Sequence, residues 1–240
     1  MKNYLINLKR DNERLQFQQE QFRVLGLDFE RIEACEDDLS RMNRFRWWCA
    51  VLRSVVPGEI GCALSHVSVY AKFLREGERC AAVFEDDVKL SPAISRALEL
   101  AKTACLKDPR LVVLLGDHRD EEHKGPIAPA NADLSVQTAD WDYCTDSYVI
   151  GAEAAHSLLR VQTHVRVPSD YWRYYRCKGW IRLARIVPHC TDQMNDRFLS
   201  HIGTYYVAAD HGLLAQVWWK ARRIVGVVLD CVLDGGKRGW

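Results

Sequence analysis

The chain has 240 residues, of which 48% are hydrophobic and 27% are charged, and its formal net charge is +1 at pH 7. This length can bury the core of one large domain, and the composition is that of a globular protein, not of a disordered or fibrous one. A net charge so close to zero creates no general attraction to nucleic acid, so we expect no nucleic-acid partner.

The cysteines and the two ends of the sequence narrow the class of protein further. Nine cysteines are scattered without a C-x-x-C pair, which argues against a disulfide scaffold or a zinc ribbon and favours reduced thiols in a cytoplasmic protein. The start, MKNYLINLKR, lacks the long apolar stretch of a secretory signal. The longest apolar run near the end, IVGVVLDCVL, has about half the length of a membrane span and contains Asp230. We therefore expect no transmembrane segment.

Short apolar runs alternate with helical patterns in the first half of the chain. Strands are predicted over 3–8 and 28–35, and the helix between them should stop at Gly26. The pattern then predicts a helix over 57–77, a buried strand over 80–86, a helix over 91–108 and a buried strand over 110–117. In the helix over 57–77 we expect an apolar stripe of five residues, namely Ile60, Leu64, Val67, Ala71 and Leu74.

The second half is less regular. A strand is predicted over 143–150, a helix over 151–162 and a final amphipathic helix over 211–233, and 119–133 is the best candidate for a long loop. Strands that alternate with helices and read as almost continuous apolar runs indicate an α/β fold with a mostly parallel central sheet flanked by helices.

Three consecutive acids, Glu85, Asp86 and Asp87, directly follow the apolar run AAVF. Burying like charges without partners is unfavourable, so either water solvates them as an ordinary turn or a cation binds them. Along an extended backbone Glu85 and Asp87 point to one side and Asp86 to the other. If the strand over 110–117 is a neighbour, Asp117 reaches the same crevice. Carboxylates suit Mn²⁺ or Mg²⁺, so Glu85 and Asp87 are the pair that could hold such an ion together, and a solvated turn is the alternative.

Several stretches, in order, carry a resemblance to a known family. YLINLKRDNER, FERIEA, PGEIGCALSHVSVYAKFL and AVFEDDV resemble glycosyltransferase family 25, the family of bacterial lipooligosaccharide galactosyltransferases, to which collagen galactosyltransferases are related. SYVIGAEAAHSLL and VPSDYW resemble its downstream segments, so the resemblance touches most of residues 1–172. It implies a GT-A-like nucleotide-sugar-binding fold, inversion at the anomeric carbon, a UDP-sugar donor with galactose as first choice, and a divalent cation at the acidic motif.

Two departures from the family pattern affect the site. EACEDDLS has acids where family members often have a glycine, and these acids, Glu36, Asp37 and Asp38, form a second cluster that could be mistaken for the metal motif. LSHIG has His201 where the family tends to have an acid, which leaves the donor or acceptor contacts of that region open.

Candidate donor-binding residues follow the first strand and lie in the helix over 57–77. Asn7 could contact the uracil or ribose and Arg10 the phosphates, with Arg14 one helical turn further, although a helix start with solvated arginines explains the same pattern. Ser65 and His66 are donor candidates through the resemblance, and a structural, hydrogen-bonded histidine is the alternative.

Inverting transfer needs a base for the acceptor hydroxyl. Asp170, in VPSDYW, is the predicted base from the family's Pro-x-Asp motif. Asp117, also a donor-binding candidate, competes for that role, and Asp146 is a third candidate for which a capping or buried-network role is favoured.

Two segments mix basic and aromatic residues. Residues 170–185 could stack on the sugars of an anionic glycolipid acceptor, or form an ordinary surface with extended arginines. In 217–228, Trp218 and Trp219 accompany Lys220, Arg222 and Arg223, the pattern of a helix at a membrane surface. A C-terminal helix packed on the core is the alternative.

The sequence therefore predicts a catalytic domain over 1–210 and a C-terminal amphipathic helix and tail over 211–240 that contacts a membrane surface. The expected activity is transfer of a hexose from a UDP-sugar to a lipooligosaccharide or lipopolysaccharide core sugar, in the cytoplasm or peripherally at the inner face of the cytoplasmic membrane. Two rival hypotheses are a metal-dependent phosphohydrolase that uses the same acids, and a glycan-binding domain without turnover.

Overall fold

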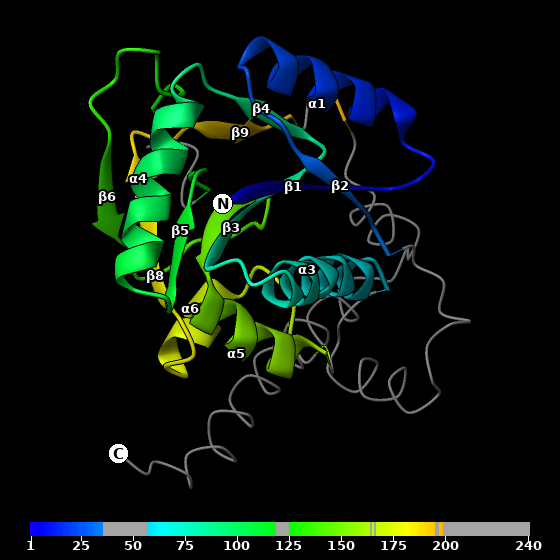
Figure 1. The fold of residues 1–240 in the computed structure, drawn as a ribbon, viewed down its shortest axis with the longest axis vertical. Coiled ribbons are helices and arrows are strands. Elements are labelled where there is room, and N and C mark those ends of the chain that lie inside the picture. Colours follow the sequence, from blue (N-terminus) through cyan, green and yellow to red (C-terminus); the bar gives the residue numbers. More distant parts are fainter. Residues whose placement is uncertain (36–56, 119–124, 164, 166, 195–196, 199–240) are drawn as a thin grey trace, which may run out of the picture.

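The computed structural model describes residues 1–35, 57–118, 125–163, 165, 167–194 and 197–198. Within them the chain forms a seven-stranded sheet with helices on both faces, and a separate two-stranded sheet (Figure 1). The predicted α/β class and the sheet flanked by helices are confirmed. None of the helices in the described part of the chain is long and apolar enough to cross a bilayer.

The elements follow the predicted alternation. The strands of the large sheet are β1 (Lys2–Asn7), β2 (Glu30–Glu33), β3 (Cys80–Glu85), β5 (Leu111–Leu114), β6 (Ser135–Thr138), β7 (Ser147–Gly151) and β8 (Arg182–Val187). The small sheet pairs β4 (Val88–Leu90) with β9 (Thr191–Gln193). The helices are α1 (Asn12–Val24), α3 (Pro57–Arg75), α4 (Ile94–Lys107), α5 (Ala152–Gln162) and α6 (Trp172–Cys177).

The large sheet is mostly parallel but contains two reversed strands. Its order is β2-β1-β3-β7-β5-β8-β6; β1, β2, β3, β5 and β8 run in one direction, while β7 and β6 run against their neighbours. The reversed β7 lies between β3 and β5, so the two acid-ended strands are not adjacent. The condition under which Asp117 would reach the crevice of Glu85 and Asp87, that their strands are neighbours, is therefore not met.

Alternate residues of the strands face two separate hydrophobic layers. In β1, Tyr4 and Ile6 pack with α3, α5 and α6, whereas Leu5 packs with α1 and α4. The same alternation continues in β3, where Val83 faces the first layer and Phe84 the second. A strand buried on both faces can have almost no polar residue, which explains why β3 reads as a continuous apolar run.

Helix α3 buries a different face from the one expected. Val69, Tyr70 and Phe73 are completely buried together with His66, whereas Leu64 and Leu74 of the predicted stripe are only partly buried. The predicted stripe is thus not the main buried face. His66 can lie inside because its two ring nitrogens both have polar partners, which removes the cost of burying them.

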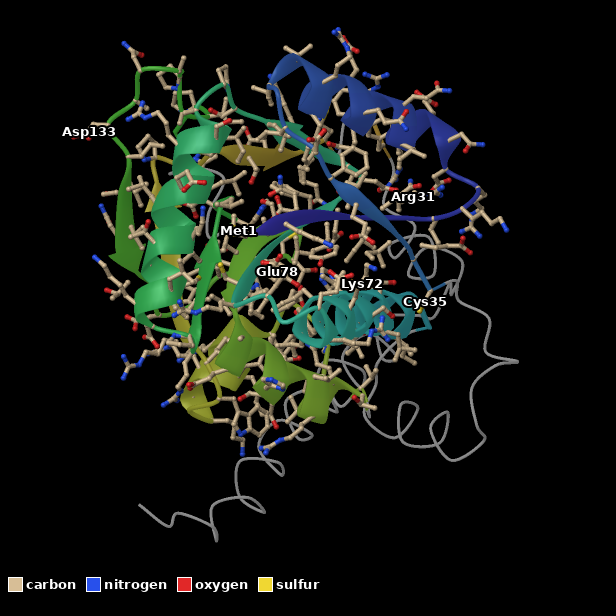
Figure 2. All side chains as sticks on the ribbon, in the orientation of Figure 1. Met1, Arg31, Cys35, Lys72, Glu78 and Asp133 are labelled. Carbon is tan, nitrogen blue, oxygen red and sulfur yellow. The ribbon has the colours of Figure 1, made fainter. Side chains whose placement is uncertain are left out.

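Charged contacts hold the end of α3 and the N-terminus against the sheet. Lys72 Nζ lies 2.7 Å from Glu30 Oε1, and the N-terminal amino group of Met1 lies 3.6 Å from Glu78 Oε2 (Figure 2). The chain turns after the helix at Gly77, whose φ of +75° suits glycine. These contacts lie at the amino ends of β1, β2 and β3. Helix α3 therefore runs back along the sheet, and its first half brings Ser65 and His66 to the carboxyl ends of the strands.

Several predictions concern residues outside the described part. The second acidic cluster at 36–38, His201, the segment 217–228, the helix over 211–233 and the boundary between 210 and 211 all lie there. Of the predicted loop 119–133, residues 125–133 are described and contain no helix or strand. Strands β4, β6, β8 and β9 and helix α6 were not predicted. Strands β4, β6 and β9 have only three or four residues, too few to establish a period, and β8 and α6 lie in a segment that mixes aromatic, basic and polar residues.

Candidate active site

A cleft of about 220 Å³ opens at the carboxyl ends of β1 and β3. Its walls come from the end of β1 and the start of α1, from α3, from the residues that follow β3, and from two loops at 144–145 and 168–170. This is where open α/β sheets bind ligands, because the loops that follow parallel strands gather at one edge.

Seven of the eight predicted site residues line this cleft: Asn7, Arg10, Ser65, His66, Glu85, Asp87 and Asp170. The eighth, Asp117, is not among its lining residues. Its carboxylate lies 3.3 Å from Arg185 Nη1, on the far side of the intervening strand β7. The convergence of Asp117 with Glu85 and Asp87, expected only if their strands were neighbours, is therefore not found.

Asp86 also lines the cleft and does not point away from it as an extended strand would require. Strand β3 ends at Glu85, and the chain turns at the next two residues. Asn7 Nδ2 donates to Asp86 Oδ2 at 2.6 Å, and Arg14 Nη1 donates to Oδ1 at 2.9 Å. Burial raises the pKa of Asp86, and these two contacts oppose the increase. Asp86 thereby fixes Asn7 and Arg14 at the floor of the cleft.

The carboxylate of Asp87 has fewer close contacts with positively charged or hydrogen-bond-donating groups than that of Asp86. Gln193 Nε2 donates to its Oδ2 at 3.2 Å and Arg14 Nη1 lies 3.8 Å from the same oxygen, while Oδ1 is buried and has no hydrogen-bond partner among the described residues. Burial and the neighbouring charge of Glu85 raise the pKa of Asp87 to about 7. A cation at Oδ1 would satisfy this oxygen and reverse the increase.

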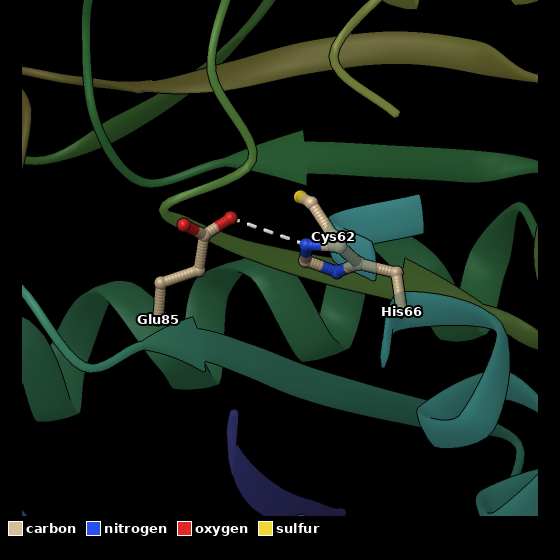
Figure 3. A group of neighbouring side chains, drawn as sticks. All are labelled: Cys62, His66 and Glu85. Atoms are coloured by element: carbon tan, nitrogen blue, oxygen red, sulfur yellow. Dashed lines mark hydrogen bonds and ion pairs between the residues drawn. The ribbon is translucent and has the colours of Figure 1, made fainter. Parts of the chain in front are cut away.

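Glu85 and His66 also line the cleft, and Cys62 lies one helical turn before His66 (Figure 3). His66 Nε2 lies 3.1 Å from Glu85 Oε1, and Thr145 Oγ1 donates to the same oxygen at 2.6 Å. Burial alone would raise the pKa of Glu85, but the contacts with His66 and Thr145 outweigh it and the pKa is lowered. Glu85 is thus held as a carboxylate beside the buried acid Asp87.

A chain of hydroxyl groups extends from His66 into the core. Its Nδ1 lies 2.7 Å from Tyr148 Oη, which lies 2.8 Å from Tyr70 Oη. A neutral imidazole that donates from Nε2 to Glu85 accepts from Tyr148, and Tyr148 in turn accepts from Tyr70. The chain therefore orients the ring toward Glu85. This contact network supports the structural alternative for His66 as well as a place in the cleft.

The remaining predicted residues differ in what they contact. Ser65 Oγ donates to Gly61 O at 2.7 Å and accepts from Cys35 N at 2.8 Å, so the hydroxyl ties α3 to the residues that follow β2. Arg10 is exposed at the rim, and Asp170 is half-buried in the loop before α6. Only Arg10 and Asp170 of this group present ionisable side chains to the cleft.

Sequence reasoning gave too little weight to several residues of the cleft. Arg14 is only 9% exposed and bridges the acids, although solvation was an equally good explanation of it. Thr145 and Gln193 each bond to one acid of the motif and were not predicted. The spacing of four residues between Arg10 and Arg14 was the available signal for the arginine, whereas nothing local marks Thr145 or Gln193.

Three of the five aromatic rings of the segment 170–185 are buried, and Tyr171 and Trp180 are partly buried against the core. Trp172 and Tyr175 are almost completely buried and pack against each other and the sheet, and Tyr174 is 7% exposed. Arg185 is also buried, between Asp117 and Asp142. Trp172, Tyr174 and Tyr175 therefore stabilise the fold by burying apolar surface and cannot stack on sugars. Contact of Tyr171, Trp180 and the exposed arginines with an acceptor stays a prediction.

The acidic motif fits a divalent cation. Glu85 and Asp87 offer carboxylate oxygens, the ligands that Mg²⁺ and Mn²⁺ prefer, and Asp87 Oδ1 is a buried acceptor without a described donor. A second arrangement, Cys62 with His66 and Glu85, brings three ligand atoms within 4.8 Å of one another. Sulfur and nitrogen suit softer ions, so the carboxylates are the better fit for a cation that accompanies phosphate.

Comparisons with known proteins agree with the sequence motifs. The family model described as Glycosyltransferase family 25 (LPS biosynthesis protein) matches residues 1–172. A glycosyltransferase 25 family member of Drosophila melanogaster is 30% identical over 170 residues, which cover 65% of this chain and 27% of that protein. Procollagen galactosyltransferase 1-B of Xenopus laevis is 25% identical and covers 66% of this chain and 28% of its own length. The resemblance stated from the motifs is confirmed.

Other similarities show how varied such relatives are. A protein of Bos taurus, named a probable inactive glycosyltransferase 25 family member 3, is 29% identical over 112 residues, which cover 46% of this chain and 18% of that protein. The chain spans about a quarter of the length of the Drosophila and Xenopus relatives. The structure of mannose-1-phosphate geranyltransferase from Thermus thermophilus matches with a TM-score of 0.33 and 14% identity, covering 79% of this chain and 60% of its own. That likeness is too distant to inform function.

Proposed function

The chain belongs to glycosyltransferase family 25, and from this premise we propose that it transfers a hexose from a UDP-sugar to a core sugar of lipooligosaccharide or lipopolysaccharide. Galactose is the first-choice hexose, and the reaction inverts the anomeric carbon. The observation that carries the proposal is the cleft in which the three acids of the motif meet Asn7, Arg14 and Asp170. It combines a candidate cation site with a candidate base.

In this proposal the donor lies across the ends of β1 and β3. Asn7 accepts from the nucleoside through Oδ1, since its Nδ2 already donates to Asp11 O and Asp86 Oδ2. Arg10, exposed at the rim, pairs with the diphosphate. Glu85 and Asp87 would hold Mn²⁺ or Mg²⁺, which when bound neutralises the charge that develops on the departing diphosphate. Arg14 keeps Asp86 and Asp87 in place through its contacts of 2.9 and 3.8 Å.

Asp170 is the proposed base because it is the acid of the family's Pro-x-Asp motif and lines the cleft outside the triple motif, as Glu59 of α3 also does. It comes from the loop before α6, and its neighbour Ser169 Oγ lies 3.1 Å from Cys62 Sγ. An acceptor hydroxyl between Asp170 and the donor would lose its proton to this carboxylate as it attacks the anomeric carbon. The bond to the UDP oxygen breaks on the opposite face, which gives inversion.

The test is transfer by the purified chain with Mn²⁺, UDP-galactose and a lipooligosaccharide acceptor, followed by mass spectrometry of the glycolipid. We expect the mass of the acceptor to increase by one hexose. Asp170→Asn should lower kcat by about 10²- to 10⁴-fold while UDP binding is retained. Asp140→Asn is the matched control, because Asp140 lies outside the cleft with an 84% exposed side chain. Failure to transfer from UDP-galactose, UDP-glucose or UDP-N-acetylhexosamine would overturn the proposal.

A glycan-binding domain without turnover is the second candidate, favoured by the Bos taurus relative whose name describes it as inactive. If the chain binds UDP and the acceptor but no hexose is transferred, this candidate stands. Phosphate release from unrelated esters without any acceptor would instead favour a phosphohydrolase. Peripheral contact with the cytoplasmic membrane belongs to the proposal through the glycolipid acceptor, and binding to vesicles with and without that lipid tests it.

A further inference from the structure

A group of metal-binding side chains lies outside the acidic motif. His118, Cys144 and Asp146 each offer one ligand atom, and these atoms all lie within 4.8 Å of one another. The histidine follows β5, and the other two residues precede β7. Because β5 and β7 are paired, the sheet brings the two segments together although they are 26 residues apart in the chain, counted from 118 to 144.

The buried carboxylate of Asp146 points to a ligand in this group. Asp146 is only 2% exposed, and its Oδ2 has no hydrogen-bond donor among the described residues. The same oxygen lies 3.1 Å from His118 Nε2. Two ligands at about 2.0 Å from a tetrahedral zinc ion are about 3.3 Å apart, so this separation is close to that of two atoms that share one ion.

Gly116 leaves open space beside His118 Nε2 and Asp146 Oδ2 because it has no side chain. A Cβ at Gly116 would lie 2.8 Å from His118 Nε2, 3.1 Å from Asp146 Oδ2 and 3.2 Å from Thr191 Oγ1. A methyl group there would crowd both ligand atoms. The absence of a side chain at this position therefore leaves the ligand atoms room to surround an ion.

The backbone holds both segments in position. His118 N donates to Asp142 Oδ1 at 3.2 Å, and the carbonyl of Asp146 accepts from Glu85 N at 2.7 Å. Cys144 Sγ makes a weak contact, 3.9 Å to Gln193 Oε1, and can turn toward the other two ligands. Three anchored ligand residues need little rearrangement to bind, which favours affinity.

We propose that His118, Cys144 and Asp146 bind a zinc ion, with water or a hydroxyl group in the fourth position. Nitrogen, sulfur and carboxylate ligands are a zinc set, in contrast to the all-oxygen set of the acidic motif. Cys144 and its neighbour Thr145 also line the cleft. The ion therefore clamps the loop that carries Thr145 to the residues after β5 and fixes one wall of the cleft.

The test uses the full chain, stripped of metal and titrated with Co²⁺ without any nucleotide sugar. We expect one equivalent of Co²⁺ to bind with a thiolate-to-cobalt charge-transfer band that Zn²⁺ abolishes. Cys144→Ser should remove the band, and Asp146→Asn and Gly116→Ala should weaken binding more than about 100-fold, beyond the usual effect of groups that only support the ligands. Circular dichroism checks that each variant is folded.

Cys62→Ser is the matched control, because Cys62 belongs to the other group of three ligand atoms. It should keep the band. Loss of the band in Cys62→Ser with retention in Cys144→Ser would overturn the assignment, as would the absence of any band in the native chain. Manganese at carboxylates gives no thiolate band, so this result is independent of the glycosyl-transfer assay.

Discussion

The substitution Asp87→Asn tests the electrostatics of the cleft most directly. Asp87 is 5% exposed, and burial followed by the charge of Glu85 raises its pKa to about 7 from an ordinary 3.8. Between these two values the folded chain binds more protons than the unfolded chain, so the stability of the metal-free protein falls as the pH rises from about 4 to 7. A difference of about three pKa units sets an upper limit of about 4 kcal/mol for this loss.

Asparagine cannot ionise, so the stability of Asp87→Asn does not fall in this way as the pH rises. We expect metal-free Asp87→Asn to be more stable than the native chain at pH 8, by up to about 4 kcal/mol, and the difference to shrink at pH 5. The free energy of unfolding from urea titrations at both pH values, in the presence of a chelator, measures it. Added Mn²⁺ at 100 times its Kd should stabilise the native chain by about 2.7 kcal/mol and the variant much less.

Asp86→Asn is the matched control with the opposite sign. The pKa of Asp86 is also raised by burial, but replacing Asp86 leaves the buried Arg14 and Asn7 without their charged partner. We therefore expect Asp86→Asn to destabilise the chain by about 1–3 kcal/mol. The reasoning is refuted if Asp87→Asn is less stable than the native chain at pH 8 without metal. Equal stabilisation of the native chain and Asp87→Asn by Mn²⁺ would refute the assignment of the metal to Asp87.

Three further outcomes are expected from the contacts described above. Tyr148→Phe should lower the free energy of unfolding, measured in urea, by about 1–3 kcal/mol, and Tyr70→Phe should lower it less. The Tyr148 hydroxyl joins the buried His66 ring to Tyr70, whereas the Tyr70 hydroxyl lies at the end of this series of hydrogen bonds. Equal losses in the two variants would contradict this arrangement of hydrogen bonds. Gly151→Ala should lower thermal stability by about 1–3 kcal/mol, because its Cβ would overlap the backbone of Pro109, whereas Gly125→Ala, with open space around it, should change little. Asp117→Asn should leave UDP affinity unchanged in calorimetry, since Asp117 does not line the cleft; a tenfold loss would restore it to the donor site.

The sequence alone indicated the order of the elements and most of the site. Apolar runs of five or six residues between helical patterns are local signals, and they located β1, β3, α1, α4 and α5 within a few residues. The acids after β3 were predicted from their place at the end of an apolar run, and Asn7 and Arg10 as donor candidates after β1. Both groups line the cleft because parallel strands end at the same edge of a sheet. Family motifs added Asp170, which no local rule would have selected.

Strand order and side-chain direction were decided by the tertiary structure. The reversed strand β7 separates β3 from β5, which moves Asp117 out of the cleft, and no local pattern reveals the direction of a buried strand. The turn after Glu85 brings Asp86 to Arg14, although an extended backbone would have directed it away. His66 became part of the buried face of α3 because Glu85 and Tyr148, distant in sequence, satisfy its nitrogens. Periodicity records which residues are apolar, whereas these positions depend on partners that only folding brings into contact.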